Sequence, residues 1–138
     1  MKEIFAAASY WIALLNPRDE FHEVAIRVSR DLEEASIVTS EMVLVELLNH
    51  MLEYGPEMRR LVVETARHLD DDPRVNVVRQ TSDQFWDAAD YYASRLDKDW
   101  GITDCASFQL MESRDIWEVL SSDHDFEQAR FVILVNQA

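Results

Sequence analysis

The sequence is short of cysteine, of basic residues and of long apolar runs. Its 138 residues include one cysteine, Cys105, which excludes an intramolecular disulfide framework, and no Cys/His cluster offers the ligands of a usual structural zinc site. The apolar N-terminus reaches Asn16 and Pro17 too soon for a membrane span, and neither a basic flank nor a cleavage pattern marks a signal peptide. We therefore expect a protein of the reducing cytoplasm with no membrane association.

Acidic residues outnumber basic ones about two to one. The chain has 27 Asp and Glu against 13 Lys and Arg, a formal net charge of -14, and only two lysines, Lys2 and Lys98. Phosphate groups are bound mainly by lysine and arginine, so this balance argues against tight nucleic-acid binding through a basic face. A hydrophobic fraction of 48% with regular spacing excludes a disordered acidic chain. We expect one folded domain over residues 1–138.

Short apolar runs alternate with amphipathic segments along the chain. The spacing predicts strands at residues 3–8, 36–39, 75–78, 116–120 and 131–135. It predicts helices at residues 11–15, 20–32, 42–54, 56–70, 82–96 and 104–112, with one further helical turn after residue 125. Strands that alternate with helices indicate an α/β fold, here a three-layer sandwich with a central, mostly parallel sheet of about five short strands.

Local signals place several helix ends. Thr39 and Ser40 form an N-cap pair, Gly55 suits a helix C-terminus, and Thr103 is expected to cap the helix at residues 104–112. Residues 82–96 are expected to turn one apolar face inward, formed by Phe85, Ala88, Ala89, Tyr92 and Leu96.

Acidic residues lie where a parallel sheet binds its ligands. Such sites lie beyond the carboxyl ends of the strands. Asp123 comes three residues after the predicted strand at 116–120, and Asp104 stands in the first turn of a predicted helix. Glu46 is a charge inside an apolar helical run, where a buried carboxylate would need a partner or a metal ion. These three acids are the candidate site residues.

Each of the three acids also has an ordinary structural role open to it. Asp104 would favour the dipole of the helix that it begins, and Asp123 is equally suited to be an N-cap. Glu46 suits an ion pair with an arginine at the edge of a helix. Taken one at a time, these residues do not distinguish a metal site from helix capping.

Four short segments spread over nearly the whole chain carry more information together. They are residues 4–15 (IFAAASYWIALL), residues 39–46 with Thr39, Ser40 and Glu46, residues 100–108 (WGITDCASF) and residues 121–126 (SSDHDF). In combination they resemble the PIN-domain family, and in particular the ribonuclease toxins of VapBC toxin–antitoxin pairs. The third segment is the most specific. The resemblance implies that the sandwich is PIN-like.

One position departs from the family pattern. The first segment should carry an aspartate where this chain has Ala7, followed by a small residue, a serine and an aromatic residue, which are present. Either a natural copy has lost its first acid, or the aspartate was replaced so that a growth-inhibiting nuclease could be produced. Retention of the other three acids favours replacement.

The resemblance implies a metal-dependent endoribonuclease, inactive or impaired here at Ala7. Family members hold one or two Mg²⁺ or Mn²⁺ ions in a cluster of acids and cleave RNA with metal-activated water, and an all-oxygen site suits these hard cations. The implied partners are an RNA substrate, a cognate antitoxin protein and a second copy of the chain in a homodimer. The implied catalytic and metal-ligating residues are Glu46, Asp104 and Asp123, with Asp125 as a further candidate ligand and Ser9 and Thr103 as supporting hydroxyls.

Two other functions are compatible with an acidic α/β domain. A noncatalytic PIN-like scaffold that binds RNA or protein is supported by the alanine at position 7. A phosphoacceptor receiver domain would need adjacent acids after the first strand and a late lysine. The second is disfavoured because the only lysines are Lys2 and Lys98.

Overall fold

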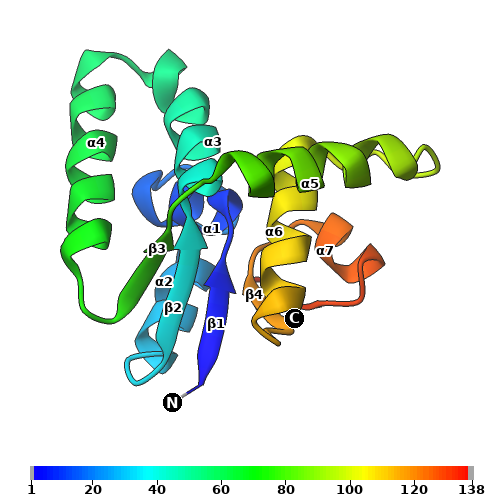
Figure 1. Cartoon of the computed structure of the whole chain (residues 1–138). Helices are drawn as coiled ribbons and strands as arrows, with labels where there is room; N and C mark the ends of the chain where they lie inside the picture. Colours follow the sequence, from blue (N-terminus) through cyan, green and yellow to red (C-terminus); the bar gives the residue numbers. More distant parts are fainter. Residues whose placement is uncertain (1, 137–138) are drawn as a thin grey trace.

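A single parallel sheet forms the centre of the computed structural model, which describes residues 2–136 (Figure 1). Its strand order is β3-β2-β1-β4-β5, and every neighbouring pair is parallel. This architecture confirms the α/β class expected from the sequence. The strands are β1 (Glu3–Ala6), β2 (Ser36–Ser40), β3 (Val75–Val78), β4 (Glu118–Leu120) and β5 (Val132–Ile133).

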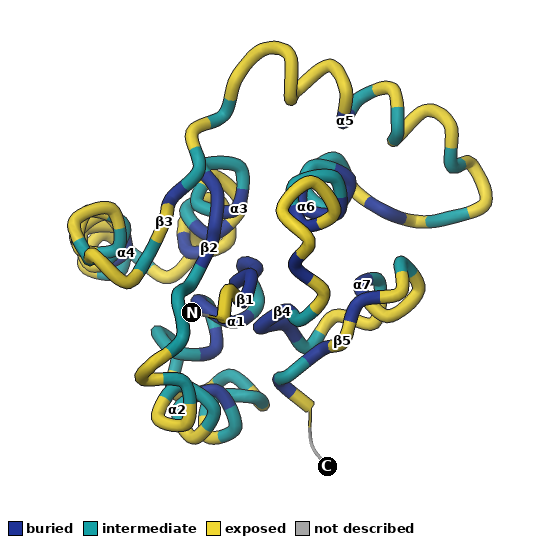
Figure 2. Tube along the Cα trace, turned by 60° about the horizontal axis from the view of Figure 1, so that its bottom comes forward, coloured by how far each residue is buried: buried dark blue, intermediate teal, exposed yellow. Residues whose placement is uncertain are grey.

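Helices cover both faces of the sheet. Figure 2 shows α2 on one side of the sheet and α6 on the other, with α5 lying beyond α6 as an outer element. Within residues 2–136, no helix is long and apolar enough to cross a lipid bilayer. The helices are α1 (Ala8–Leu15), α2 (His22–Asp31), α3 (Glu41–Met51), the 3-10 helix η1 (Leu52–Tyr54), α4 (Pro56–Asp71), α5 (Ser82–Ser94), α6 (Ile102–Ser113) and α7 (His124–Gln128).

Most of the expected helix ends are confirmed by capping geometry. The Ser40 side chain accepts a hydrogen bond from the Val43 amide at 3.1 Å, and Gly55 adopts a positive φ of 95° before α4 begins. The expected cap at Thr103 is wrong, because α6 begins at Ile102, two residues before the expected start, and Gly101 is its N-cap. A side chain at the third helical position, Asp104, bonds back to the Gly101 amide instead.

The first strand is shorter than expected and the first helix longer. The strand ends at Ala6, and α1 begins at Ala8 rather than at Trp11. Alanine is the best helix former, so the small residues that follow the strand extend the helix toward its N-terminus. Ala7 is the single residue between them, in an extended conformation as the N-cap of α1.

The inward face expected for α5 is largely wrong. Ala88 is fully buried, but Phe85 and Tyr92 are exposed. Leu96, which retains 89% of its accessible surface, lies beyond the end of the helix at Ser94. The helix packs on α6 through a neighbouring stripe that includes Ala88 and Tyr91, whose ring contacts Trp100. Because α5 is an outer element with one partner helix, its apolar residues are not all needed in the core.

The chain reverses its direction across the sheet at β1. From β1 it winds outward through β2 and β3, and it then returns to add β4 and β5 on the other side of β1. The crevice between β1 and β4 is therefore the topological switch point of the sheet, where ligands bind in open α/β folds. Ala6 pairs with Leu120 there, so Ala7 and the segment from Ser121 onward leave the sheet side by side.

Candidate metal centre

Three carboxyl groups converge beyond the carboxyl edge of the sheet. Oxygen atoms of Asp104, Asp123 and Asp125 all lie within 4.8 Å of one another. Asp104 comes from the first turn of α6, whereas Asp123 and Asp125 come from the turn between β4 and α7 and from α7 itself. Two segments separated in sequence thus bring like charges together next to the switch point.

Asp104 is held by the start of its own helix. Its Oδ2 atom accepts a hydrogen bond from the Gly101 amide at 3.0 Å. Burial raises the pKa of Asp104 to about 7, and the nearby charges of Asp123, Glu46 and Asp125 raise it further against the opposing effect of the Gly101 amide. A carboxyl group that titrates near neutrality in an acidic cluster will lose its proton more readily when a cation binds.

Asp123 and Asp125 are fixed by the turn that carries them. The Asp123 amide donates to Ser121 Oγ at 3.0 Å, and Asp123 Oδ1 accepts from the Asp125 amide at 2.9 Å as the N-cap of α7. Burial raises the pKa of Asp125, the charges of Asp123 and Asp99 act in the same direction, and a hydrogen bond with Asp104 opposes them. Asp123 is therefore both a helix cap and a member of the cluster, so its two possible roles are compatible.

Glu46 lies beside this cluster but outside the group of three. It sits on the exposed side of α3, and partial desolvation of its carboxyl group is the main cause of a raised pKa. The Asp123 charge also raises this pKa, while a hydrogen bond with Thr103 and the charge of His50 lower it. The structure thus brings Glu46 and Thr103 together near Asp123.

Ser9 ties the N-terminal helix to the acidic turn. Its hydroxyl lies 3.0 Å from the hydroxyl of the fully buried Ser121 and accepts a bond from the Ser122 amide at 3.3 Å. The Ala7 amide donates to the Leu120 carbonyl at 3.1 Å on the same side of the sheet. Position 7, where the resemblance expects an acid, is thus fastened to the strand that leads into Asp123.

Two contributors to the site were not predicted from the sequence. Asp99 acts on Asp125 from the loop before α6, and Ser121 supplies the buried hydroxyl that holds the Asp123 turn. Asp99 stands in a polar loop whose composition gives no signal. Ser121 belongs to the segment SSDHDF, and its position directly after a predicted strand is the signal that could have identified it.

The donor set suits a hard divalent cation. All three clustered side chains offer carboxylate oxygens, the ligands that Mg²⁺ and Mn²⁺ prefer, and no histidine or cysteine is among them. Two ionised carboxylates about 5 Å apart repel by roughly 3 kcal/mol at an effective dielectric constant near 20. A bound cation would replace this repulsion with attraction.

The chain is similar in sequence and structure to known proteins. The sequence pattern of the PIN domain matches residues 4–132. VapC20 from Mycobacterium tuberculosis, described as a toxin that cleaves the sarcin-ricin loop, superposes with a TM-score of 0.83 at 28% identity, and the match covers 94% of this chain and 96% of that one. A comparison with curated protein sequences finds no match.

Two more distant structures share the fold. FitAcB from Neisseria gonorrhoeae superposes with a TM-score of 0.64 at 14% identity, covering 94% of this chain and 95% of that chain. VapBC2 from Rickettsia felis, bound to a DNA fragment from its promoter, gives 0.66 at 10% identity, covering 95% and 96%. The family match spans nearly the whole sequence and includes the strand ends that carry the acids, and on this basis the chain belongs to the PIN domain family.

Proposed function

We propose that this chain is a metal-dependent endoribonuclease, the toxin of a toxin–antitoxin pair, with its activity silenced at Ala7. The observation that carries the proposal is the meeting of Asp104, Asp123 and Asp125 within 4.8 Å at the switch point of the sheet. The similarity to VapC20, a toxin that cleaves the sarcin-ricin loop, supports RNA as the substrate class.

The chain's own residues would hold and orient the reacting groups. Asp104, Asp123 and Asp125 would bind Mg²⁺ or Mn²⁺, with Glu46 facing them from α3. The cation, when bound, supplies an acidified water and offsets charge on the phosphate and the leaving oxygen. Ser9 would keep the Asp123 turn in place, and the hydrogen bond with Thr103 would orient Glu46.

The strongly acidic surface is compatible with an anionic substrate at such a site. A divalent cation converts a negative cleft into a phosphate-binding site, so the global charge of -14 weighs less than it would for a protein that binds RNA through a basic face. The same charge disfavours tight binding of RNA away from the cation. We therefore expect RNA binding that depends on the metal.

Ala7 supports both the silenced nuclease and the second candidate, a noncatalytic PIN-like scaffold that binds RNA or protein. As the N-cap of α1, position 7 has the extended backbone in which aspartate is among the best residues and alanine among the poorest. A position that suits aspartate locally and lies beside an acidic turn is consistent with the loss of a functional acid. The retained acids favour the nuclease.

An antitoxin and a second copy of the chain are the proposed protein partners. A basic segment that places an arginine or lysine against the acid cluster would inhibit the site and suit the negative surface. Exposed apolar side chains on α5, among them Phe85 and Trp86, offer area for self-association. Sedimentation velocity, alone and with a basic antitoxin peptide, distinguishes a monomer, a homodimer and a complex.

Cleavage of RNA tests the proposed activity. The chain, the Ala7→Asp variant and the Ala7→Asp/Asp104→Asn double variant are incubated with total RNA and a sarcin-ricin loop hairpin, with Mg²⁺ or Mn²⁺ or with EDTA. We expect cleavage only by Ala7→Asp and only with metal. If no variant cuts any RNA while the chain still binds RNA or protein, the scaffold is the better description.

A further inference from the structure

The acid cluster is assembled from two segments whose carboxyl groups repel each other when ionised. A hydrogen bond between Asp104 and Asp125 links them only while Asp104 carries its proton, so other contacts must hold the segments together before a cation arrives. Asp104 belongs to α6, and Asp123 and Asp125 belong to the start of α7. The helix α7 has only five residues, and isolated helices of that length are not stable in water. The position of its acids must therefore depend on contacts made elsewhere along it.

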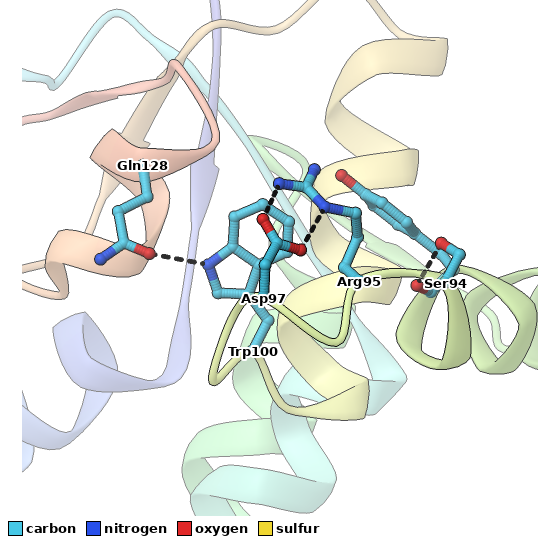
Figure 3. A network of polar contacts seen from close by, with 6 residues as sticks. Ser94, Arg95, Asp97, Trp100 and Gln128 are labelled. Carbon is cyan, nitrogen blue, oxygen red and sulfur yellow. Dashed lines mark hydrogen bonds and ion pairs between the residues drawn. The ribbon is translucent and has the colours of Figure 1, made fainter.

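Trp100 makes a direct bond to the far end of α7. Its indole Nε1 donates a hydrogen bond to the Gln128 side-chain oxygen at 3.2 Å (Figure 3). Trp100 immediately precedes Gly101, the N-cap whose amide holds the Asp104 carboxylate. One hydrogen bond thus connects the residue before the Asp104 anchor with the last residue of the helix that carries Asp125.

Aromatic packing provides a second connection between the same elements. The Trp100 ring meets Phe108 of α6 edge to face at 4.9 Å, and Phe108 meets Phe126 of α7 in the same manner at 5.1 Å. All three rings are buried, with at most 5% of their surface exposed. Such pairs contribute beyond the area that they bury. Phe126 directly follows Asp125, so this stack fixes the backbone beside the cluster.

The loop before α6 closes over the outer side of Trp100. The Arg95 guanidinium lies 4.8 Å from the centre of the Trp100 ring and makes two 3.0 Å hydrogen bonds to the Asp97 carboxylate, as Figure 3 shows. The Lys98 ammonium lies 5.9 Å from the same ring. These contacts keep the indole in the orientation in which its N–H reaches Gln128.

We propose that the Trp100–Gln128 hydrogen bond is a brace that holds α7 against the start of α6 and thereby sets the spacing of the acid cluster. Gln128 is then a positioning residue: it acts on the acids through the helix that carries them. The consequence for metal binding rests on the proposed function, whereas the bracing of α7 does not.

Substitutions that keep shape but remove one bonding partner isolate the brace. Gln128→Met removes the acceptor, Trp100→Phe removes the N–H donor but retains a ring, and the double variant removes both. Gln109→Met is the matched control, because the Gln109 amide bonds to the Asp87 carbonyl on the α5 side of α6. Each is made in the chain itself and in the Ala7→Asp variant.

The first measurement is hydrogen exchange of the α7 amides without metal. It includes the amides of Phe126 and Ala129, which donate to the carbonyls of Asp123 and Asp125. We expect about fivefold faster exchange in both single variants, which corresponds to about 1 kcal/mol for one net hydrogen bond. We expect little additional change in the double variant, because its two substitutions remove the same bond. Unchanged exchange in both single variants overturns the brace.

The second measurement is Mn²⁺ affinity by calorimetry well below the melting temperature. We expect the dissociation constant to rise about fivefold in the brace variants and to stay unchanged in Gln109→Met. A lower melting temperature with unchanged affinity would reduce Gln128 to an ordinary structural residue and contradict its positioning role. If neither the chain itself nor the Ala7→Asp variant binds Mn²⁺, the proposed metal site is wrong. The exchange data then still decide whether the brace exists.

Discussion

The amide of Ala7 donates a hydrogen bond to the carbonyl of Leu120 at 3.1 Å, across the switch point of the sheet. Leu120 is the last residue of β4, and Asp123 follows it by three residues. Ala7 is 6% exposed and precedes α1 as its N-cap, in an extended conformation. A side chain introduced at position 7 therefore acts on the helix and on the acidic turn at once.

Replacing Ala7 separates these two effects. Ala7→Asn supplies a neutral capping side chain and is expected to stabilise the fold by about 1 kcal/mol. Ala7→Asp supplies a cap with a charge that the acid cluster repels, and we expect it to be less stable than Ala7→Asn by about 1–3 kcal/mol without metal. Mn²⁺ is expected to restore the aspartate variant. Thermal melts with EDTA and with Mn²⁺ measure the three proteins.

Equal melting temperatures for the aspartate and asparagine variants in both conditions would show that a charge at position 7 does not interact with the acid cluster. If both variants are stabilised equally as N-caps, then the charge of the aspartate has no effect and residue 7 does not interact with the acids of the turn.

The stability of the metal-free protein should fall as pH rises from about 4 to about 7. Asp104 has an ordinary pKa of 3.8 and a folded pKa of about 7, so the folded state binds its proton more tightly than the unfolded state. The contribution is fully present below about pH 4 and is lost as pH rises through about 7, a loss of about 2–4 kcal/mol after allowance for partial exposure.

Urea unfolding at several pH values with EDTA measures this dependence, and Asp104→Asn is its control. The asparagine variant has no proton to lose and should show a much smaller decline between pH 5 and 8. An identical pH slope in the variant would mean that another group causes the decline.

The order of the elements follows closely from the periodicity of the sequence, whereas the orientation of an outer helix does not. The N-cap at Ser40 and the positive φ at Gly55 are local features, so residue type predicts them. The face of α5 depends on which helix covers it. Because α6 covers the side of α5 that carries Ala88, Phe85 and Tyr92 remain exposed despite their helical spacing.

Only part of the arrangement of the acids is predictable from the sequence, and Glu46 lies outside the cluster of three. Parallel strands bring their carboxyl ends to one edge, so the place of Asp123 directly after β4 predicts its position there. Asp104 follows α5 rather than a strand, so its meeting with Asp123 also depends on how α6 packs. The part played by Gln128 is not predictable in this way, because the partner of an exposed glutamine depends on packing between segments 28 residues apart.

The observed face of α5 can be tested by two opposite substitutions. Tyr92→Gln replaces a 54% exposed side chain of the expected face and should change the free energy of unfolding by no more than about 1 kcal/mol. Ala88→Leu enlarges a fully buried side chain at the contact with α6 and should cost about 1–3 kcal/mol. Chemical denaturation measures both. A larger cost for Tyr92→Gln would restore the inward face expected from the periodicity.

The serine link between α1 and the acidic turn should contribute measurably to stability. Ser9→Ala leaves the buried Ser121 hydroxyl and the Ser122 amide without their shared partner, at a cost of about 1–2 kcal/mol. Ser113→Ala is the control, since the Ser113 hydroxyl bonds only its own helix at the Leu110 carbonyl and lies on an exposed residue. If Ser9→Ala lowers the free energy of unfolding no more than Ser113→Ala does, then Ser9 does not hold the Asp123 turn in place.

Titration of Mn²⁺ into the chain, Ala7→Asn and Ala7→Asp tests most directly whether Ala7 occupies a ligand position of the acid cluster. An added carboxylate ligand should tighten binding at least tenfold in Ala7→Asp, whereas the neutral Ala7→Asn should bind like the chain itself. Asp104→Asn in the Ala7→Asp background should abolish the gain. Equal affinities for the aspartate and asparagine variants would contradict a shared metal site.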